Sequence, residues 1–308
     1  MSGELVQRVS SKVRRQTGAI SEMLVDFAVA CLRAMPFRPK MIFASLVGRM
    51  LFLLWRSRRA DAVYWSSRAI GLPLDDPETV ATARRSFANF AKFSMDFVDS
   101  AVLPRRQRVA AKLRQMENKE VLENAAKDPR GCLLVSAHIG NWELLGSWVS
   151  LLGRDLYVVA LPLPANSLNK LAIEVRENAG MGLIDTSGAA SGILRALTRG
   201  DWVAILADRP VSERGERVEF LGRRDHHPIG AVRLAKRARV PIVVGACWSD
   251  GSGGYYGKLF DAIETDDPAV TAEDAMSAAL RHVESVIRQL PDQWYIAYTS
   301  NPSEDDAN

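Results

Sequence analysis

The sequence is poor in cysteine: Cys31, Cys132 and Cys247 lie far apart, and no Cys-x-x-Cys pair occurs. A zinc ribbon is therefore excluded, and a disulfide framework is not indicated. All three cysteines lie in apolar runs and are predicted to be buried structural thiols in a reducing, cytosolic compartment. Histidine is also scarce. The adjacent pair His226-His227 has no third ligand beside it, so no metal site is predicted.

Long apolar runs are absent as well. A helix needs roughly 20 apolar residues to span a bilayer. The most apolar N-terminal segments are 23–35 and 41–55; Arg49 interrupts the second, and the residues Arg-Ser-Arg-Arg follow it. Both segments are too short for a span. No cleavage site of small residues follows them, so no signal peptide is predicted.

Positive charge is concentrated in the first 60 residues. The whole chain has a formal net charge of +4, but residues 1–60 hold 11 lysines and arginines against 3 acidic residues, so the remainder is net negative. Apolar helices edged by basic side chains are typical of proteins that lie on an anionic membrane surface. We therefore predict membrane-associating amphipathic helices in 1–60; packing of these helices on the domain core is the alternative. The basic residues alternate with aliphatic rather than aromatic side chains, so nucleic-acid binding is not predicted.

From about residue 131 onward, short apolar runs alternate with helical patterns. This alternation predicts an α/β fold with a mixed, mainly parallel central sheet flanked by helices, preceded by the N-terminal amphipathic helices. We expect one domain over 61–300 and a polar tail over 301–308. The predicted strands are 132–136, 156–160, 202–207, 217–220 and 240–247, and the predicted helices are 78–102, 141–152, 167–179, 188–199, 229–238 and 271–290.

The segment 133–144 has the clearest chemical pattern. A buried strand is followed by His138, then by Gly140, which lets the chain bend, and by Asn141, a good N-cap for the next helix. Side chains at the ends of strands in α/β sheets commonly meet ligands. Across this corner we expect the Glu143 carboxylate to accept a hydrogen bond from one imidazole nitrogen, which leaves the other nitrogen of His138 free as a general base.

The six residues 138–143, His-Ile-Gly-Asn-Trp-Glu, resemble the His-x4-Glu motif of the bacterial lipid A biosynthesis (lauroyl/myristoyl) acyltransferases. They equally resemble the related phosphatidylinositol mannoside acyltransferases, within the wider His-x4-Asp/Glu glycerolipid acyltransferase group. The resemblance extends over about residues 40–300. It implies a glycerolipid acyltransferase-like fold and transfer of a fatty acyl chain from acyl-ACP or acyl-CoA to a hydroxyl of a membrane glycolipid or phospholipid. It also implies a peripheral or monotopic protein on the cytoplasmic face of the inner membrane, with no cofactor.

Further site residues follow from the same resemblance. Asp208, after another strand, is expected to contact His138 or to position the acceptor hydroxyl. Arg209 is expected to bind phosphate or to orient the acyl donor, or alternatively to form a structural ion pair with Asp208. Arg176 follows a Leu-Pro-Leu-Pro segment and is expected to meet an anionic headgroup or the donor's phosphates; an exposed surface arginine is the alternative.

Residues 218–231 contain Phe-x-Gly, an intervening loop and Pro-x-Gly before a helix, which also resembles the family. The helix N-terminus near Gly230 is expected to bind a phosphate. The predicted catalytic residues are thus His138, Glu143 and Asp208, and the predicted substrate-binding residues are Asn141, Arg176, Arg209, Arg223 and Gly230.

No covalent nucleophile is indicated. The chain lacks a Gly-x-Ser-x-Gly elbow, and Ser136 lies too close to His138 in the strand for a Ser–His hydrolase pair. We therefore expect direct attack of the acceptor hydroxyl on the thioester. A lipid A-type acceptor is favoured, with a phosphatidylinositol mannoside-type acceptor as the alternative, because the Trp294-Tyr295 end resembles both branches. A lipid ester or thioester hydrolase and a non-catalytic membrane-binding protein also remain open.

Overall fold

The computed structural model describes residues 26–160, 166–209 and 215–299. Within these ranges a seven-stranded sheet has the order β1-β9-β8-β2-β5-β3-β4. All neighbouring strands are parallel except β8 and β9, which form an antiparallel pair. The predicted mixed, mainly parallel sheet is confirmed. Its strands are β1 (Leu113–Glu117), β2 (Cys132–Ser136), β3 (Leu156–Ala160), β4 (Met181–Asp185), β5 (Trp202–Leu206), β8 (Ile242–Ser249) and β9 (Tyr255–Leu259).

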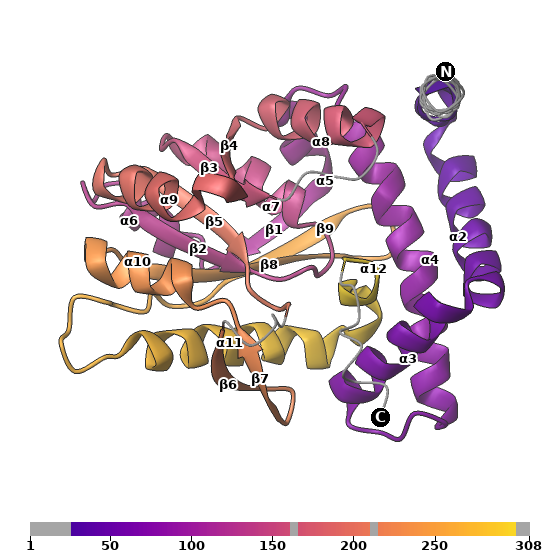
Figure 1. Cartoon of the computed structure of the whole chain (residues 1–308). Coiled ribbons are helices and arrows are strands. Elements are labelled where there is room, and N and C mark those ends of the chain that lie inside the picture. Colours follow the sequence, from indigo (N-terminus) through magenta and orange to yellow (C-terminus); the bar gives the residue numbers. More distant parts are fainter. Residues whose placement is uncertain (1–25, 161–165, 210–214, 300–308) are drawn as a thin grey trace, which may run out of the picture.

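Helices cover both faces of this sheet (Figure 1). One face carries α5 (Arg105–Lys112), α6 (Glu120–Ala125), α7 (Trp142–Val149) and α8 (Asn166–Asn178), and the other carries α9 (Ala189–Thr198), α10 (Gly230–Ala238) and α11 (Ala272–Gln289). Strand β2 shows why two layers form. Its residues Leu133 and Val135 belong to the core beneath α10 and α11, whereas Cys132 and Leu134 belong to the core beneath α7. Alternate side chains of a strand point to opposite faces, so an all-apolar strand needs cover on both.

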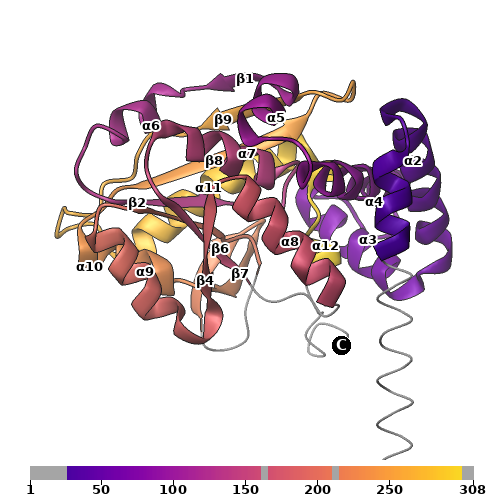
Figure 2. The same ribbon diagram turned by 90° about the horizontal axis from the view of Figure 1, so that it is seen from above.

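The N-terminal helices stand together at one end of the sheet (Figure 2). They are α2 (Phe37–Leu54), α3 (Arg56–Ile70) and α4 (Pro77–Ser100). Gly48 lets α2 lie against α4, because a Cβ at that position would be only 2.5 Å from the carbonyl oxygen of Phe87. The predicted boundary at residue 60 lies inside α3. None of the helices in the described ranges is long and apolar enough to cross a bilayer.

Two local expectations are wrong. Residues 222–230, predicted as a loop, contain β7 (Arg223–His227), which pairs antiparallel with β6 (Glu216–Phe220) in a separate hairpin. Its two turn residues, Leu221 and Gly222, both have positive φ, which is the conformation that a two-residue hairpin requires. The second error concerns Cys31, which is exposed on the N-terminal helical segment, whereas Cys132 and Cys247 are buried in the sheet as expected.

Candidate active site

The turn after β2 is fixed by backbone contacts with strand β8 and with the C-terminal segment. Gly140 has φ +58°, and a Cβ there would collide with the carbonyl oxygen of Cys247. Its N–H donates to Gln293 O at 2.8 Å, and the N–H of Asn141 donates to Cys247 O at 2.7 Å. The side chain of Asn141 then caps α7 by accepting from Leu144 N at 2.9 Å. The predicted N-cap is therefore confirmed, and the side chain of Asn141 stabilises the start of α7.

His138 is bound by the carboxylate of Asp208, which follows the neighbouring strand β5. Its Nδ1 lies 2.9 Å from Asp208 Oδ1, and its main-chain N–H donates to Asp208 Oδ2 at 3.0 Å. The indole N–H of Trp294 donates to the same Oδ2 at 2.7 Å. Strands β2 and β5 are parallel and adjacent, with Ser136 opposite Leu206, so the residues that follow them meet at one edge of the sheet. The expected contact between Asp208 and His138 is confirmed.

Asp208 is completely buried, and its surroundings favour the ionised form. Burial alone raises the pKa of this carboxyl, but the charge and hydrogen bonds of His138 together with the indole N–H lower it below its ordinary value. An ionised carboxylate only accepts hydrogen bonds, so it holds the proton of the imidazole on Nδ1. Nε2 is then the free acceptor, and the His138 side chain is 16% exposed. This is the arrangement that a general base requires.

Glu143 does not orient His138, and that predicted contact is wrong. Its Oε1 instead accepts from Arg176 Nη2 at 2.9 Å and from Arg176 Nε at 3.2 Å. The physical reason lies in the first turn of α7, which carries the buried Glu143 side chain toward α8, while Asp208 already occupies Nδ1 of His138. Arg176 is therefore bound by Glu143, and the alternative prediction of an exposed surface arginine is wrong.

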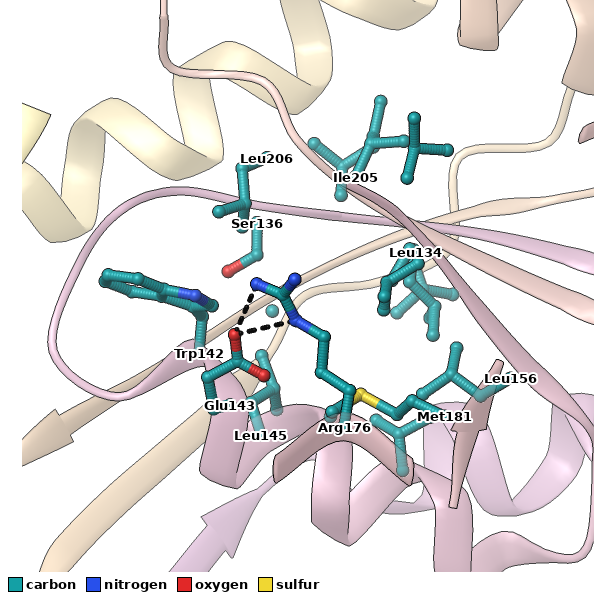
Figure 3. Close-up of a pocket in the computed structure, with 18 of the residues that line it drawn as sticks. Leu134, Ser136, Trp142, Glu143, Leu145, Leu156, Arg176, Met181, Ile205 and Leu206 are labelled. Atoms are coloured by element: carbon teal, nitrogen blue, oxygen red, sulfur yellow. Dashed lines mark hydrogen bonds and ion pairs between the residues drawn. The ribbon is translucent and has the colours of Figure 1, made fainter. Parts of the chain in front are cut away.

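The Glu143–Arg176 pair lies at one end of an apolar cavity between α7 and the sheet (Figure 3). The cavity has an empty volume of about 670 Å³. Ser136 and Trp142 lie at the same end as the ion pair, and the hydroxyl of Ser136 has no hydrogen-bond partner in the described part of the chain. Trp142 also contacts His138 edge to face, with the ring centroids 5.3 Å apart. The rest of the lining is aliphatic or Met, including Leu134, Leu145, Leu156, Met181, Ile205 and Leu206.

A model of the bacterial lipid A biosynthesis acyltransferase family matches residues 9–297, which is nearly the whole chain. The chain belongs to this family. Phosphatidylinositol mannoside acyltransferases of Mycolicibacterium smegmatis and Mycobacterium tuberculosis are 26% identical to it over 147 and 146 residues. These matches cover 46% of this chain, and the chain spans about half the length of these curated relatives, 48% and 46%. A solved 1-acyl-sn-glycerophosphate acyltransferase of Thermotoga maritima aligns over 84% of this chain and 100% of its own, with a TM-score of 0.41 and 11% identity.

In this member of the lipid A biosynthesis acyltransferase family, three predicted substrate-binding residues remain: Arg209, Arg223 and Gly230. Arg209 is half-buried directly after Asp208, but the alternative ion pair between them is wrong, since Asp208 is bound by His138 and Trp294. Arg223, exposed on β7, donates to the Tyr64 hydroxyl at 2.7 Å. Gly230 is the first residue of α10, as predicted. The structure therefore brings His138 and Asp208 together and places Glu143 and Arg176 in a second pair.

Trp294 is the site residue that the sequence did not reveal as such. It is buried, binds Asp208, and lies in the segment that also supplies Tyr295, whose N–H donates to His138 O at 2.7 Å. The Trp294-Tyr295 pair resembles the family, but its distance from His138 in the sequence gives no sign that the residues are in contact. Among the described residues, no group of three His, Cys, Asp or Glu side chains is arranged to hold a metal ion.

Proposed function

We propose that this chain transfers a fatty acyl group from the thioester of acyl-ACP or acyl-CoA to a hydroxyl group of a membrane lipid. The observation that carries the proposal is the His138–Asp208 pair beside the apolar cavity, joined to it through the contact of His138 with Trp142. The name of the family fits a lipid A-type acceptor, which we favour. The mycobacterial relatives fit a phosphatidylinositol mannoside-type acceptor, which is the alternative.

In the proposed mechanism Asp208 keeps the proton on Nδ1 of His138, so Nε2 takes the proton of the acceptor hydroxyl. The hydroxyl oxygen forms a bond with the thioester carbon, and the carbon–sulfur bond breaks. The sulfur leaves as a thiol after it receives the proton from the imidazolium. General base catalysis of this kind contributes roughly 10²–10⁴-fold to the rate. Arg209 or backbone N–H groups stabilise the oxyanion of the tetrahedral intermediate.

The apolar cavity accommodates the acyl chain in this proposal. The lining of the cavity is apolar apart from Ser136, the indole N–H of Trp142 and the Glu143–Arg176 pair, which suits a fatty acyl chain. In place of orienting the imidazole, Glu143 holds Arg176, and the pair keeps two charges compensated at one end of the cavity. Glu143 therefore acts as a positioning residue rather than as a partner of the base.

Membrane recruitment is the task we propose for the outer face of α2. Its side chains Ile42, Phe43, Leu46, Met50, Leu53 and Leu54 are between 46% and 69% exposed. Exposed apolar side chains in this number are unusual on a monomeric protein and mark an interaction surface. Arg38 and Arg49 of the same helix are also exposed, which suits an anionic lipid surface. We place the protein at the cytoplasmic face of the inner membrane.

The decisive experiment is mass spectrometry of membrane lipids from cells with and without the protein, repeated with His138→Ala. An added acyl chain that depends on His138 identifies both the acceptor and the chain length. Release of free fatty acid in place of acyl transfer would identify a lipid ester or thioester hydrolase. Unchanged acyl transfer in His138→Ala would remove the catalytic assignment of His138. The absence of both acyl transfer and acyl release in the native protein would leave a membrane-binding protein.

A further inference from the structure

A second cavity lies beside the His138 corner, between α2, α4 and the turn that joins β8 to β9. We call it the α2–α4 cleft. Its empty volume is about 1370 Å³, and it extends to Gly140 and Tyr295. Phe93 lines this cleft and Trp142 lines the apolar cavity, and their ring centroids are 4.3 Å apart. This pair of rings therefore lies between the two cavities, and Trp142 also contacts His138.

The carboxylates of the α2–α4 cleft are all engaged. Asp96 binds Lys112 Nζ at 3.0 Å and accepts from the Tyr255 hydroxyl. Asp250 lies 3.6 Å from Arg114 Nε and also accepts from the backbone of its own turn. Asp292 lies 3.4 Å from Arg85 Nε and 3.3 Å from the amide of Asn89. Each acidic side chain thus has a cationic partner, and the partner of Asp292, Arg85, also binds Glu78 at 2.6 Å.

Two cations that line the cleft are not engaged in this way. The side chains of Arg38 in α2 and Lys92 in α4 have no hydrogen bond or ion pair with another described residue. Lys92 is half-buried as a residue, and Arg38 is exposed. Because the three carboxylates are paired, these two cations are the unpaired charges among the described residues that line the cleft. A guanidinium and an ammonium group that line the same cleft suit the charge and the acceptor oxygens of a phosphate group.

We infer that the α2–α4 cleft binds a phosphate group, with Lys92 and Arg38 as its ligands. The identity of the molecule that carries this phosphate rests on the proposed function. The donor carries a phosphate in its phosphopantetheine arm, and a phospholipid or phosphorylated glycolipid acceptor carries one in its headgroup. Either source places the rest of the substrate beside the His138 corner, because the cleft ends at Tyr295, whose N–H binds His138 O.

Calorimetric titration of the whole chain tests this inference without turnover. The probes are 4′-phosphopantetheine against pantetheine, and inositol 1-phosphate against inositol. We expect one phosphorylated probe to bind roughly tenfold or more tightly than its unphosphorylated counterpart, since hydrogen bonds to charged groups are the stronger ones. The first pair reports a donor phosphate and the second an acceptor phosphate. Lys92→Gln and Arg38→Gln are each expected to reduce this preference.

Arg84→Gln is the matched control, because Arg84 is an exposed cation of α4 outside the cleft and its loss leaves the preference unchanged. Arg38 is exposed, so its variant keeps the test valid if Lys92→Gln unfolds. Equal binding within both probe pairs, or a full preference in folded Lys92→Gln and Arg38→Gln, overturns the inference. An intact phosphate preference in a protein without acyl transfer would remove only the proposed function.

Discussion

Asp208 accepts three hydrogen bonds from groups that lie far apart in the chain: the ring and the main-chain N–H of His138 and the indole N–H of Trp294. The first of these holds the imidazole in the tautomer needed for base catalysis. The other two fix the carboxylate itself. A residue held this firmly adds both orientation and charge to the site, and the two contributions can be separated by substitution.

Asp208→Asn keeps the size of the side chain but removes its charge. We expect kcat for acyl transfer to fall by about 10²–10⁴-fold, because the amide no longer favours the Nδ1–H tautomer of His138 or its protonated form. Steady-state kinetics with a saturating acyl donor measure the effect. Asp201→Asn is the matched control, since Asp201 precedes β5 and pairs with Arg199 away from the site. A loss of less than threefold in Asp208→Asn would contradict the role.

The same carboxylate makes folding stability depend on pH. The folded-state pKa of Asp208 lies below its unfolded value of about 3.9, so its contribution is fully present above that value and is lost as the pH falls through the folded pKa. We expect urea midpoints of the native protein to fall more steeply below about pH 4 than those of Asp208→Asn. Parallel curves for the two proteins would show that Asp208 is not ionised in the fold.

At the level of elements, α2 has two opposed faces with different neighbours. Gly48 and Phe52 are buried against α4 and its surroundings, whereas Leu46 and Leu53 face outward. The helix is held by its inner face, so its outer face is available to bind another surface without unfolding. Removal of the whole N-terminal segment would therefore also expose α4, and single-face substitutions are the better probe.

The triple variant Ile42→Gln, Leu46→Gln, Leu53→Gln is expected to fold normally and to bind anionic vesicles about tenfold or more weakly. Each of these large side chains contributes roughly 1.5–3 kcal/mol when it is fully buried in an apolar phase, and partial insertion contributes less. Flotation with anionic vesicles gives the measurement, and circular dichroism checks the fold. Leu183→Gln on β4 serves as the control for loss of an exposed leucine. Equal recovery of the triple variant and the native protein would count against membrane contact through α2.

For the whole molecule, the apolar cavity and the His138 corner depend on several elements at once. Walls of the cavity come from β2, β3, β5 and β8 on one side and from α7 and α8 on the other. Its depth is therefore set by how the layers pack and not by any one segment. Under the proposed function, the preferred length of the acyl chain should follow this depth.

Ala204→Leu enlarges a side chain of β5 that lines the cavity between Leu134 and Val158. We expect the preferred donor to become shorter, because each methylene that no longer fits costs about 1–3 kcal/mol in kcat/KM. Competition between acyl donors of graded length, analysed by mass spectrometry of the product, measures the preference. Ala190→Leu, on the exposed side of α9, should leave it unchanged. A uniform loss of activity at every chain length would argue against this location for the acyl chain.

The sequence by itself determined the local features. The strand 132–136, the bend at Gly140 and the cap at Asn141 depend on residues a few positions apart, so apolar patterning and backbone preferences predict them. The fold class was also accessible, because strand–helix alternation favours a mainly parallel sheet covered on both faces. The hairpin β6–β7 was missed, since its strand β7 has the sequence Arg-Arg-Asp-His-His and no apolar signal of its own.

Only the tertiary structure decided which carboxylate serves His138. Glu143 is near in sequence, but the first turn of α7 directs it to Arg176. Asp208 is 70 residues away and follows β5, the strand next to β2. Trp294 joins them from the far end of the chain. A hydrogen bond between distant residues depends on strand order and layer packing, which arise from the burial of the whole apolar surface and leave no local pattern in the sequence.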